Sequence, residues 1–72
     1  MNVKAKVLVI DDEKPIRRLV RLILTEKGYD VIEADNGALG LSEAAARHPD
    51  LIILDLGLPD MEGHKVIRKL RE

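Results

Sequence analysis

Two short runs made only of aliphatic residues constrain the fold of this chain more than any other feature. They are residues 7–10 (Val-Leu-Val-Ile) and residues 51–54 (Leu-Ile-Ile-Leu). Neither run alternates with polar residues, and a strand of this kind is buried on both faces, as in a parallel sheet covered by helices. A further strand is expected over residues 29–34, which include Val31 and Ile32. The sequence therefore predicts three strands in a covered sheet.

Helices are predicted between and after these strands. Pro15 opens the first helix, over residues 15–27, because a proline in the first turn loses no helical hydrogen bond. Gly28 can end this helix in a left-handed cap. Residues 38–47 are rich in Ala, Leu and Glu and favour a second helix, and a third is expected over residues 62–71.

The resulting order, β-α-β-α-β-α, indicates an α/β fold whose parallel strands are joined by right-handed crossovers. The chain has 72 residues, so we expect one domain over residues 1–72. In such a sheet the ligand site lies beyond the carboxyl ends of the strands, where the strand order reverses. If the strands are arranged in the order 2-1-3, that reversal falls between the first and the third strand.

Composition excludes several classes of function. The chain has no cysteine, which rules out disulfides and thiolate metal sites. No apolar run approaches the roughly 18 residues that span a membrane, and the start of the chain does not resemble a signal peptide. The 12 basic and 13 acidic side chains nearly balance, and the only aromatic residue is Tyr29, so nothing indicates a nucleic-acid surface. We expect a cytoplasmic protein that binds neither membrane nor nucleic acid directly.

Aspartates follow both aliphatic runs directly. Asp11 and Asp12 come after the first run and Asp55 after the second. In the 2-1-3 order their carboxylates converge, which is costly unless a cation lies among them or a proton is taken up. Mg²⁺ suits such oxygen ligands and is usually held by one or two carboxylates. A single acid after a strand is ordinarily a solvated turn residue or a helix-dipole partner, whereas three acids in these positions favour a metal site.

Several segments of the sequence resemble the receiver domains of two-component response regulators. The matching segments are residues 7–13 (Val-Leu-Val-Ile-Asp-Asp-Glu), 15–17, 28–31, 34–38 and, most specifically, 49–63. The similarity covers essentially the whole chain and implies a flavodoxin-like fold. The segment Asp-Leu-Gly-Leu-Pro-Asp at residues 55–60 is most similar to the winged-helix subclass, and within it to regulators of potassium-uptake operons.

This resemblance implies roles for individual residues. Asp55 matches the phosphoacceptor, which receives a phosphoryl group from a sensor histidine kinase. Asp12 matches the direct Mg²⁺ ligand, and Asp11 matches its neighbour that acts mainly through water. Gly57 matches the position whose backbone carbonyl completes the protein ligands. The implied cofactor is Mg²⁺, held by Asp11, Asp12, Asp55 and Gly57.

The resemblance also implies what this sequence lacks. Receivers have five βα units, and three are recognisable here, so a truncated receiver without the last two βα units is expected. The family's Ser or Thr after the fourth strand and its Lys after the fifth have no match, because Lys65 and Lys69 lie on the third predicted helix. We therefore expect phosphorylation to cause little conformational switching.

Other polar residues have simpler interpretations. His48 is expected to contact the final carbonyls of the second helix, and His64 to be solvated. Asp35 and Asp60 are expected in turns and caps. A solvated face is the expectation for three arginines on the first helix, Arg17, Arg18 and Arg21.

The first predicted helix has a wider apolar arc than one sheet contact needs. Its expected core stripe consists of Ile16, Leu19, Val20, Ile23 and Leu24. Pro15 and Leu22 extend this stripe sideways, and in receivers this edge docks the helical bundle of the kinase. The resemblance thus implies a docking surface at Pro15, Leu19 and Leu22, and the alternative is that Leu22 is a solitary exposed side chain.

The sequence and its family resemblance indicate two possible functions of different classes. The first is the phosphoacceptor module of a response regulator, which is not an enzyme beyond promoting phosphoryl transfer to Asp55. The alternative is a non-switching unit for self-association or kinase docking. A metal-dependent phosphatase would use the same acids but lacks a general acid. A homodimer or higher oligomer is expected in either case, through the exposed edge of residues 51–54 or through swapped helices.

Overall fold

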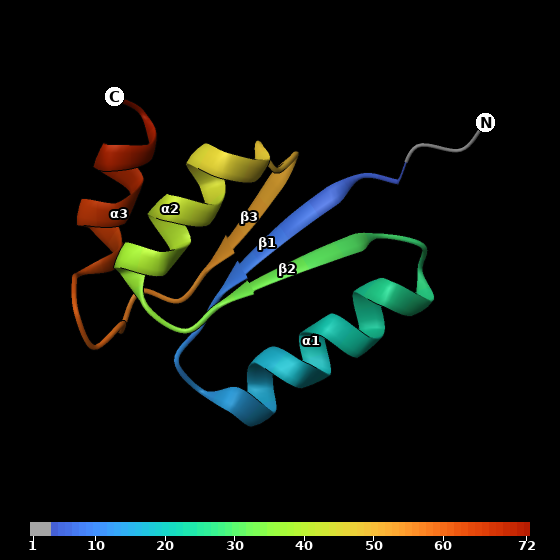
Figure 1. Ribbon diagram of the computed structural model, residues 1–72. Coiled ribbons are helices and arrows are strands. Elements are labelled where there is room, and N and C mark those ends of the chain that lie inside the picture. The colour runs from blue at the N-terminus through green and yellow to red at the C-terminus, as the bar shows by residue number, and fades with distance from the viewer. Residues whose placement is uncertain (1–3) are drawn as a thin grey trace.

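Three parallel strands form the centre of the molecule. The computed structural model describes residues 4–72, and its strands are β1 (Lys6–Ile10), β2 (Asp30–Ala34) and β3 (Leu51–Leu54). They are ordered β2-β1-β3, which confirms the predicted order 2-1-3 (Figure 1). In the register of the sheet, Leu8 at the centre of β1 pairs with Ile32 on one side and Ile52 on the other.

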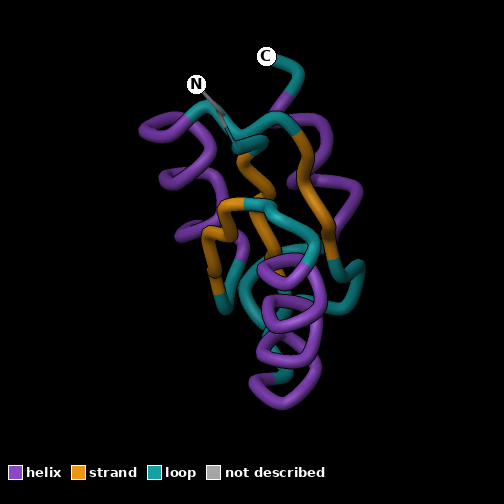
Figure 2. The backbone as a smooth tube through the Cα atoms, turned by 90° about the vertical axis from the view of Figure 1, so that its right-hand side faces the viewer, coloured by secondary structure: helices purple, strands orange, loops and turns teal. Residues whose placement is uncertain are grey.

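Each strand is followed by a helix. These are α1 (Lys14–Glu26), α2 (Gly37–Arg47) and α3 (Gly63–Leu70), each within one residue of its predicted bounds. Helix α1 lies on one side of the sheet, and α2 and α3 lie together on the other (Figures 1 and 2). Strand β1 is thus covered on both faces, whereas β3, which was also expected to be buried on both faces, is exposed on the α1 side. Within residues 4–72, every helix is too short or too polar to cross a bilayer.

The core lies between the sheet and the pair of helices α2 and α3. Its buried members are Leu8, Ile10, Ile32, Ala34, Leu58 and Val66. Successive side chains of a strand point to opposite faces, so Val7 and Val9 face α1, and both are also buried. The central strand is thus buried on both faces, as its uninterrupted apolar run predicts.

Two residues with positive φ close the first two helices. Gly28 follows α1 with φ of 92°, which confirms the predicted left-handed cap, and its N–H donates to the carbonyl of Thr25 at 3.0 Å. His48 ends α2 with φ of 48°. Its contact with the last turn is made by the backbone N–H, which donates to the carbonyl of Ala44 at 3.1 Å.

The expected core stripe of α1 is only partly buried, which corrects the sequence-based prediction. No residue of α1 is buried, and Leu19 keeps 53% of its surface exposed. The reason is that α1 packs over β1 and β2. The sheet face beside it on β3 is left uncovered by residues 4–72, with Leu51 and Ile53 exposed.

A close approach between α2 and β1 generates a stability prediction at Gly40. A Cβ atom at Gly40 would meet Ile10 Cδ1 at 2.5 Å and Cγ1 at 2.9 Å. Helix propensity alone would make Gly40→Ala stabilising by about 1 kcal/mol. Because Ile10 is fully buried, we expect instead that overpacking lowers the free energy of unfolding by about 1–3 kcal/mol, measured by urea denaturation.

The same substitution in an Ile10→Val background provides the control. Valine lacks the Cδ1 atom that a Cβ at Gly40 would meet first, so Gly40→Ala should be less destabilising there than in the wild-type background. A stabilising effect of Gly40→Ala in the wild-type background would contradict the close packing of α2 on β1.

Candidate functional site

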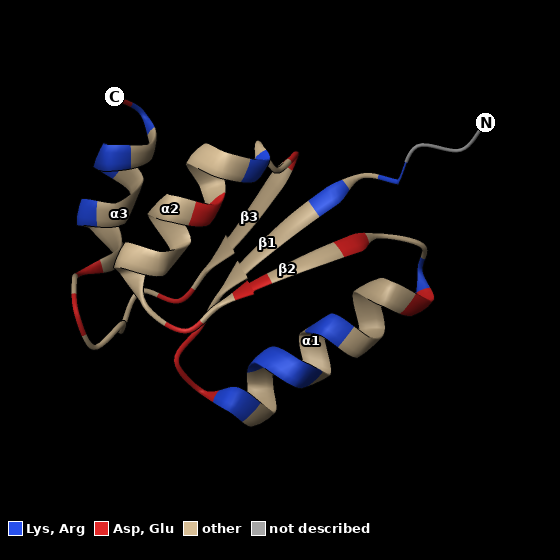
Figure 3. Cartoon of the chain, in the orientation of Figure 1, with Lys and Arg blue, Asp and Glu red and all other residues tan. Residues whose placement is uncertain are grey.

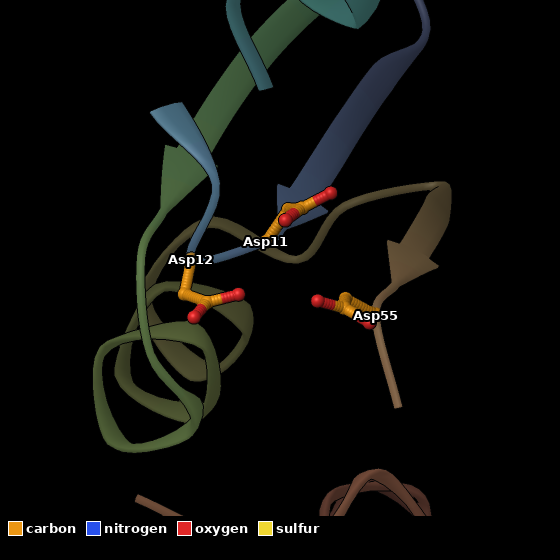
Figure 4. Close-up of side chains that lie close together, drawn as sticks. All are labelled: Asp11, Asp12 and Asp55. Atoms are coloured by element: carbon orange, nitrogen blue, oxygen red, sulfur yellow. The ribbon is translucent and has the colours of Figure 1, made fainter. Parts of the chain in front are cut away.

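Three carboxylates meet at the carboxyl ends of β1 and β3. Asp11 and Asp12 follow β1, and Asp55 follows β3. One oxygen from each carboxylate lies within 4.8 Å of the others, and the side chains of Asp12 and Asp55 face each other across a gap (Figure 4). Asp11 and Asp55 are half-buried and Asp12 is exposed. The convergence expected from the strand order is therefore present.

The sheet itself positions these acids. The N–H of Asp11 donates to the carbonyl of Ala34 at 3.0 Å, and the N–H of Asp55 donates to the carbonyl of Ile10 at 2.9 Å. Both bonds continue the parallel ladder by one residue past the strands. Asp11 and Asp55 thus take their places from the same register that pairs the core residues.

Local hydrogen bonds orient two of the carboxylates. Asp11 Oδ1 accepts from the N–H of Glu13 at 2.9 Å, and Asp55 Oδ1 accepts from the N–H of Gly57 at 3.0 Å. Both are two-residue turns closed by an aspartate side chain. Among the described residues, the second oxygen of each of these carboxylates and both oxygens of Asp12 accept no hydrogen bond, so they remain available to a ligand.

The donor set fits a small hard cation. All three side chains offer carboxylate oxygens, which suit Mg²⁺, and they follow neighbouring strands. Among the described residues, none of these carboxylates forms an ion pair. Such a concentration of negative charge is stabilised by a cation. Gly57 lies in the loop two residues after Asp55, where an added Cβ would meet only Asp55 Oδ1, at 3.7 Å. Packing therefore does not require a glycine at this position.

A fourth acid, Asp60, has partners that the sequence did not reveal. Its Oδ1 accepts from the N–H of Gly37 at 2.6 Å and its Oδ2 from the N–H of Ala38 at 2.9 Å. Asn36 is the local cap of α2 and accepts from the N–H of Leu39 at 2.8 Å. Asp60 was expected to be a turn and cap residue, and it does cap a helix, but that helix is α2, which begins more than twenty residues earlier in the chain.

These bonds tie the loop that follows Asp55 to helix α2. The hydrogen bonds from Gly37 and then Ala38 lower the pKa of the Asp60 carboxyl below its usual value, because they favour the charged form. Met61, next to Asp60, lies against Gly37, where a Cβ would collide with its side chain. The loop between β3 and α3 is therefore held against the start of α2.

Arg17 departs from the prediction of a solvated face, whereas Arg18 and Arg21 are exposed as predicted. Arg17 Nε lies 3.0 Å from Glu33 Oε1, and Arg21 Nη1 lies 2.6 Å from Glu33 Oε2. The Arg17 side chain is only 14% exposed. Partial burial by itself raises the pKa of the Glu33 carboxyl. The hydrogen bonds and charges of Arg21 and Arg17 together lower this pKa by more, so the net pKa is below the usual value. These pairs join α1 to β2. Figure 3 shows basic residues of α1 in blue and acidic residues at the carboxyl end of β2 in red.

The remaining candidate residues lie outside the carboxylate cluster. His48 and His64 are exposed, at the end of α2 and in the first turn of α3. On α1, the side chains of Leu19 and Leu22 are 53% and 57% exposed, and Pro15 is exposed as well. Leu22 is therefore not a solitary exposed apolar side chain on this helix.

Sequence comparisons identify relatives over nearly the whole chain. The model of the response regulator receiver domain matches residues 7–72. The KDP operon transcriptional regulatory protein KdpE of Escherichia coli is 54% identical over 66 residues, which are 92% of this chain and 29% of that protein. The transcriptional regulatory protein KdpE of Mycobacterium tuberculosis is 57% identical over 65 residues, 90% of this chain and 29% of that protein. The chain thus spans less than a third of these curated relatives.

Solved structures of response regulators have the same fold. The chemotaxis response regulator CheY4 of Vibrio cholerae superposes with a TM-score of 0.93 and 36% identity, covering 96% of this chain and 57% of that one. A CheY-like response regulator receiver domain from Methanospirillum hungatei gives a TM-score of 0.94 and 30% identity, with coverage of 96% and 55%. The β2-β1-β3 sheet and its helices therefore correspond to slightly more than half of these structures.

The lowered pKa of Asp60 generates a prediction about acid stability. A carboxyl whose pKa is depressed by folding stabilises the protein above its unfolded pKa and loses this contribution as the pH falls through the folded pKa. Asp60→Asn cannot carry the charge. We therefore expect the melting temperature of the wild type to fall more steeply below about pH 4 than that of Asp60→Asn.

The comparison is made by thermal unfolding between neutral and acidic pH. Asp30→Asn is the matched control, because Asp30 is an exposed acid at the opposite end of β2. It should keep the wild-type pH profile. Parallel profiles for the wild type and Asp60→Asn would show that the bonds to Gly37 and Ala38 contribute nothing in solution.

Proposed function

Because this chain belongs to the response regulator receiver family, we propose that Asp55 accepts a phosphoryl group from a sensor histidine kinase with the help of Mg²⁺. Family membership was predicted from the sequence, as was the likeness to winged-helix regulators, and the KdpE relatives agree with it. The observation that carries the proposal is the convergence of Asp11, Asp12 and Asp55 at the strand ends.

The proposed reaction transfers the phosphoryl group to a carboxylate oxygen. The free oxygen of Asp55 attacks phosphorus, a P–O bond forms as the P–N bond to the kinase histidine breaks, and the imidazole leaves with a proton. The N–H of Gly57 holds the other oxygen and so sets the rotation of the carboxylate. When bound, Mg²⁺ supplies the positive charge that allows two anionic groups to approach. Asp11, Asp12 and the Gly57 carbonyl are its proposed ligands together with Asp55.

A phosphoacceptor accounts for the site better than a hydrolytic enzyme does. Within residues 4–72, neither histidine belongs to the carboxylate cluster, and the acids beside Asp55 are the proposed Mg²⁺ ligands. We propose that the protein at most promotes transfer to its own aspartate. The relatives are named as transcriptional regulators, and a cytoplasmic location is proposed on that basis.

The start of α1 is the proposed docking surface for the kinase. Helix α1 begins at Lys14, two residues after Asp12, so a partner seated on its first turns lies beside the carboxylates. Pro15, Leu19 and Leu22 offer exposed apolar contacts there. Exposed apolar side chains that lie together are the usual anchors of a protein interface.

Incubation with a small phosphodonor and Mg²⁺, followed by intact-mass spectrometry, tests the proposed function. We expect a mass increase of one phosphoryl group, absent in Asp55→Asn because the nucleophilic oxygen is replaced. Calorimetric titration should detect weak Mg²⁺ binding that Asp12→Ala abolishes. Asp30→Asn, at the far end of β2, is the control and should behave as the wild type in both assays. Phosphorylation that persists in Asp55→Asn would refute the assignment.

For the 72-residue polypeptide we further propose that phosphorylation changes structure only locally. Within residues 4–72, no hydroxyl or lysine side chain forms a hydrogen bond or an ion pair with Asp11, Asp12 or Asp55, so we expect the added phosphoryl group to lack a differential contact that would favour a second conformation. Amide spectra recorded before and after phosphorylation should differ only near Asp55. Large shifts of amide resonances on the far side of the sheet would contradict a purely local change.

The open edge of β3 favours self-association as a second function. Within residues 4–72, β3 pairs only with β1, and Leu51 and Ile53 are exposed beside that free edge. An unprotected edge is a template for another strand. Two copies related by a two-fold axis would pair their β3 edges antiparallel, and exchange of helices is the other route.

Sedimentation equilibrium of the 72-residue polypeptide tests the association. We expect a dimer or larger species at high concentration, and we expect Ile53→Lys to shift it toward the monomer because charges on an edge strand oppose pairing. Leu22→Lys on α1 is the control for apolar exposure away from the edge. A folded monomer across the whole concentration range would exclude self-association.

A further inference from the structure

We infer that Arg17 is a positioning residue for the acidic site, acting through the backbone of Asp11. Arg17 Nη1 donates to the carbonyl oxygen of Asp11 at 2.9 Å. Arg17 does not belong to the carboxylate cluster. The inference concerns how Asp11 and Asp12 are held, and it rests on the proposed binding of Mg²⁺ by these residues.

The Asp11 carbonyl matters because it belongs to the peptide unit that joins Asp11 to Asp12. This unit is planar, so fixing its oxygen fixes the direction in which the chain continues to Asp12. Within the described residues, the carboxylate of Asp12 accepts no hydrogen bond of its own. The placement of Asp12 opposite Asp55 (Figure 4) therefore depends on the backbone that leads to it.

Arg17 is itself held in place from β2. Its Nε bonds Glu33 Oε1 at 3.0 Å while Nη1 reaches Asp11. A guanidinium presents its N–H groups in a rigid planar fork, so it can serve both acceptors at once. Because the Arg17 side chain is only 14% exposed, water competes little for these hydrogen bonds. The Glu33 carboxylate thus sets the orientation of the group that holds Asp11.

Adjacent residues of β2 therefore fix both backbone polar groups of Asp11. The carbonyl of Ala34 accepts from the Asp11 N–H, and Glu33, one residue earlier, holds the arginine that donates to the Asp11 carbonyl. Neighbouring groups that orient metal ligands typically change metal affinity by about 10- to 100-fold when removed. An effect of this kind is expected for Arg17.

A purely structural role is the competing explanation, because no residue of α1 is buried and the ion pairs help to join it to β2. Arg21 separates the two roles. It binds the same Glu33 carboxylate from the next turn of α1, at 2.6 Å, and makes no bond to Asp11. Loss of Arg21 weakens the attachment of α1, whereas loss of Arg17 weakens that attachment and also frees the Asp11 carbonyl.

The test compares Arg17→Gln with Arg21→Gln by calorimetric titration with Mg²⁺ and by thermal unfolding. Both variants should lower the melting temperature. Arg17→Gln should weaken Mg²⁺ binding by about 10-fold, while Arg21→Gln should leave it within about 2-fold of the wild type, as expected for an exposed ion pair. Equal Mg²⁺ affinities in the two variants would overturn the inference.

A second readout does not depend on the metal. The ¹³C resonance of the Asp11 carbonyl should shift in Arg17→Gln, because a hydrogen bond to its oxygen is lost, and should stay in place in Arg21→Gln. If Arg17→Gln does not fold, Arg17→Lys replaces it, since an ammonium lacks the fork that reaches both acceptors. An unmoved resonance in the folded variant would refute the Asp11 contact. A wild type that binds no Mg²⁺ would instead refute the proposed function.

Discussion

The parallel register of β1 with its two neighbours is the constraint on which the site depends. The same ladder that pairs Leu8 with Ile32 and Ile52 continues to the N–H groups of Asp11 and Asp55. A slip by one residue would turn the apolar side chains to the wrong faces of the sheet, and it would also separate the carboxylates. Burial of the aliphatic strands therefore supplies the free energy that holds like charges together.

The order of elements and the meeting of the acids were predictable because their signals are local. Uninterrupted apolar runs mark the strands, and aspartates directly after two of them must share an edge once the order 2-1-3 is assumed. The contacts of Asp60 and Glu33 were not predictable in the same way. Asp60 binds amides of α2, and Glu33 binds arginines of α1. Such contacts depend on how the helices pack on the sheet, which a short sequence pattern does not predict.

The exposure of α1 was missed for a related reason. Helical spacing reports which side chains can share a face, but it does not report how wide a surface will cover that face. Leu19 lies in the predicted stripe and is still half exposed, because the part of the sheet beside β3 is not covered within residues 4–72. Charged pairs to Glu33 supplement the contact of this helix with the sheet.

The unequal attachment of the strands has a consequence for the order in which the site would open. In the described part of the chain, β1 is hydrogen-bonded on both sides and β3 on one. Asp11 and Asp12 thus follow the best-anchored strand, while Asp55 follows a strand that can fray from its free side. The cation proposed for these three acids would link β3 to β1 at their carboxyl ends, and its binding free energy would add to the free energy of detaching β3. If the proposed cation binds here, it would restrain the outer strand and protect the amides of β3 from solvent exchange more than those of the central strand.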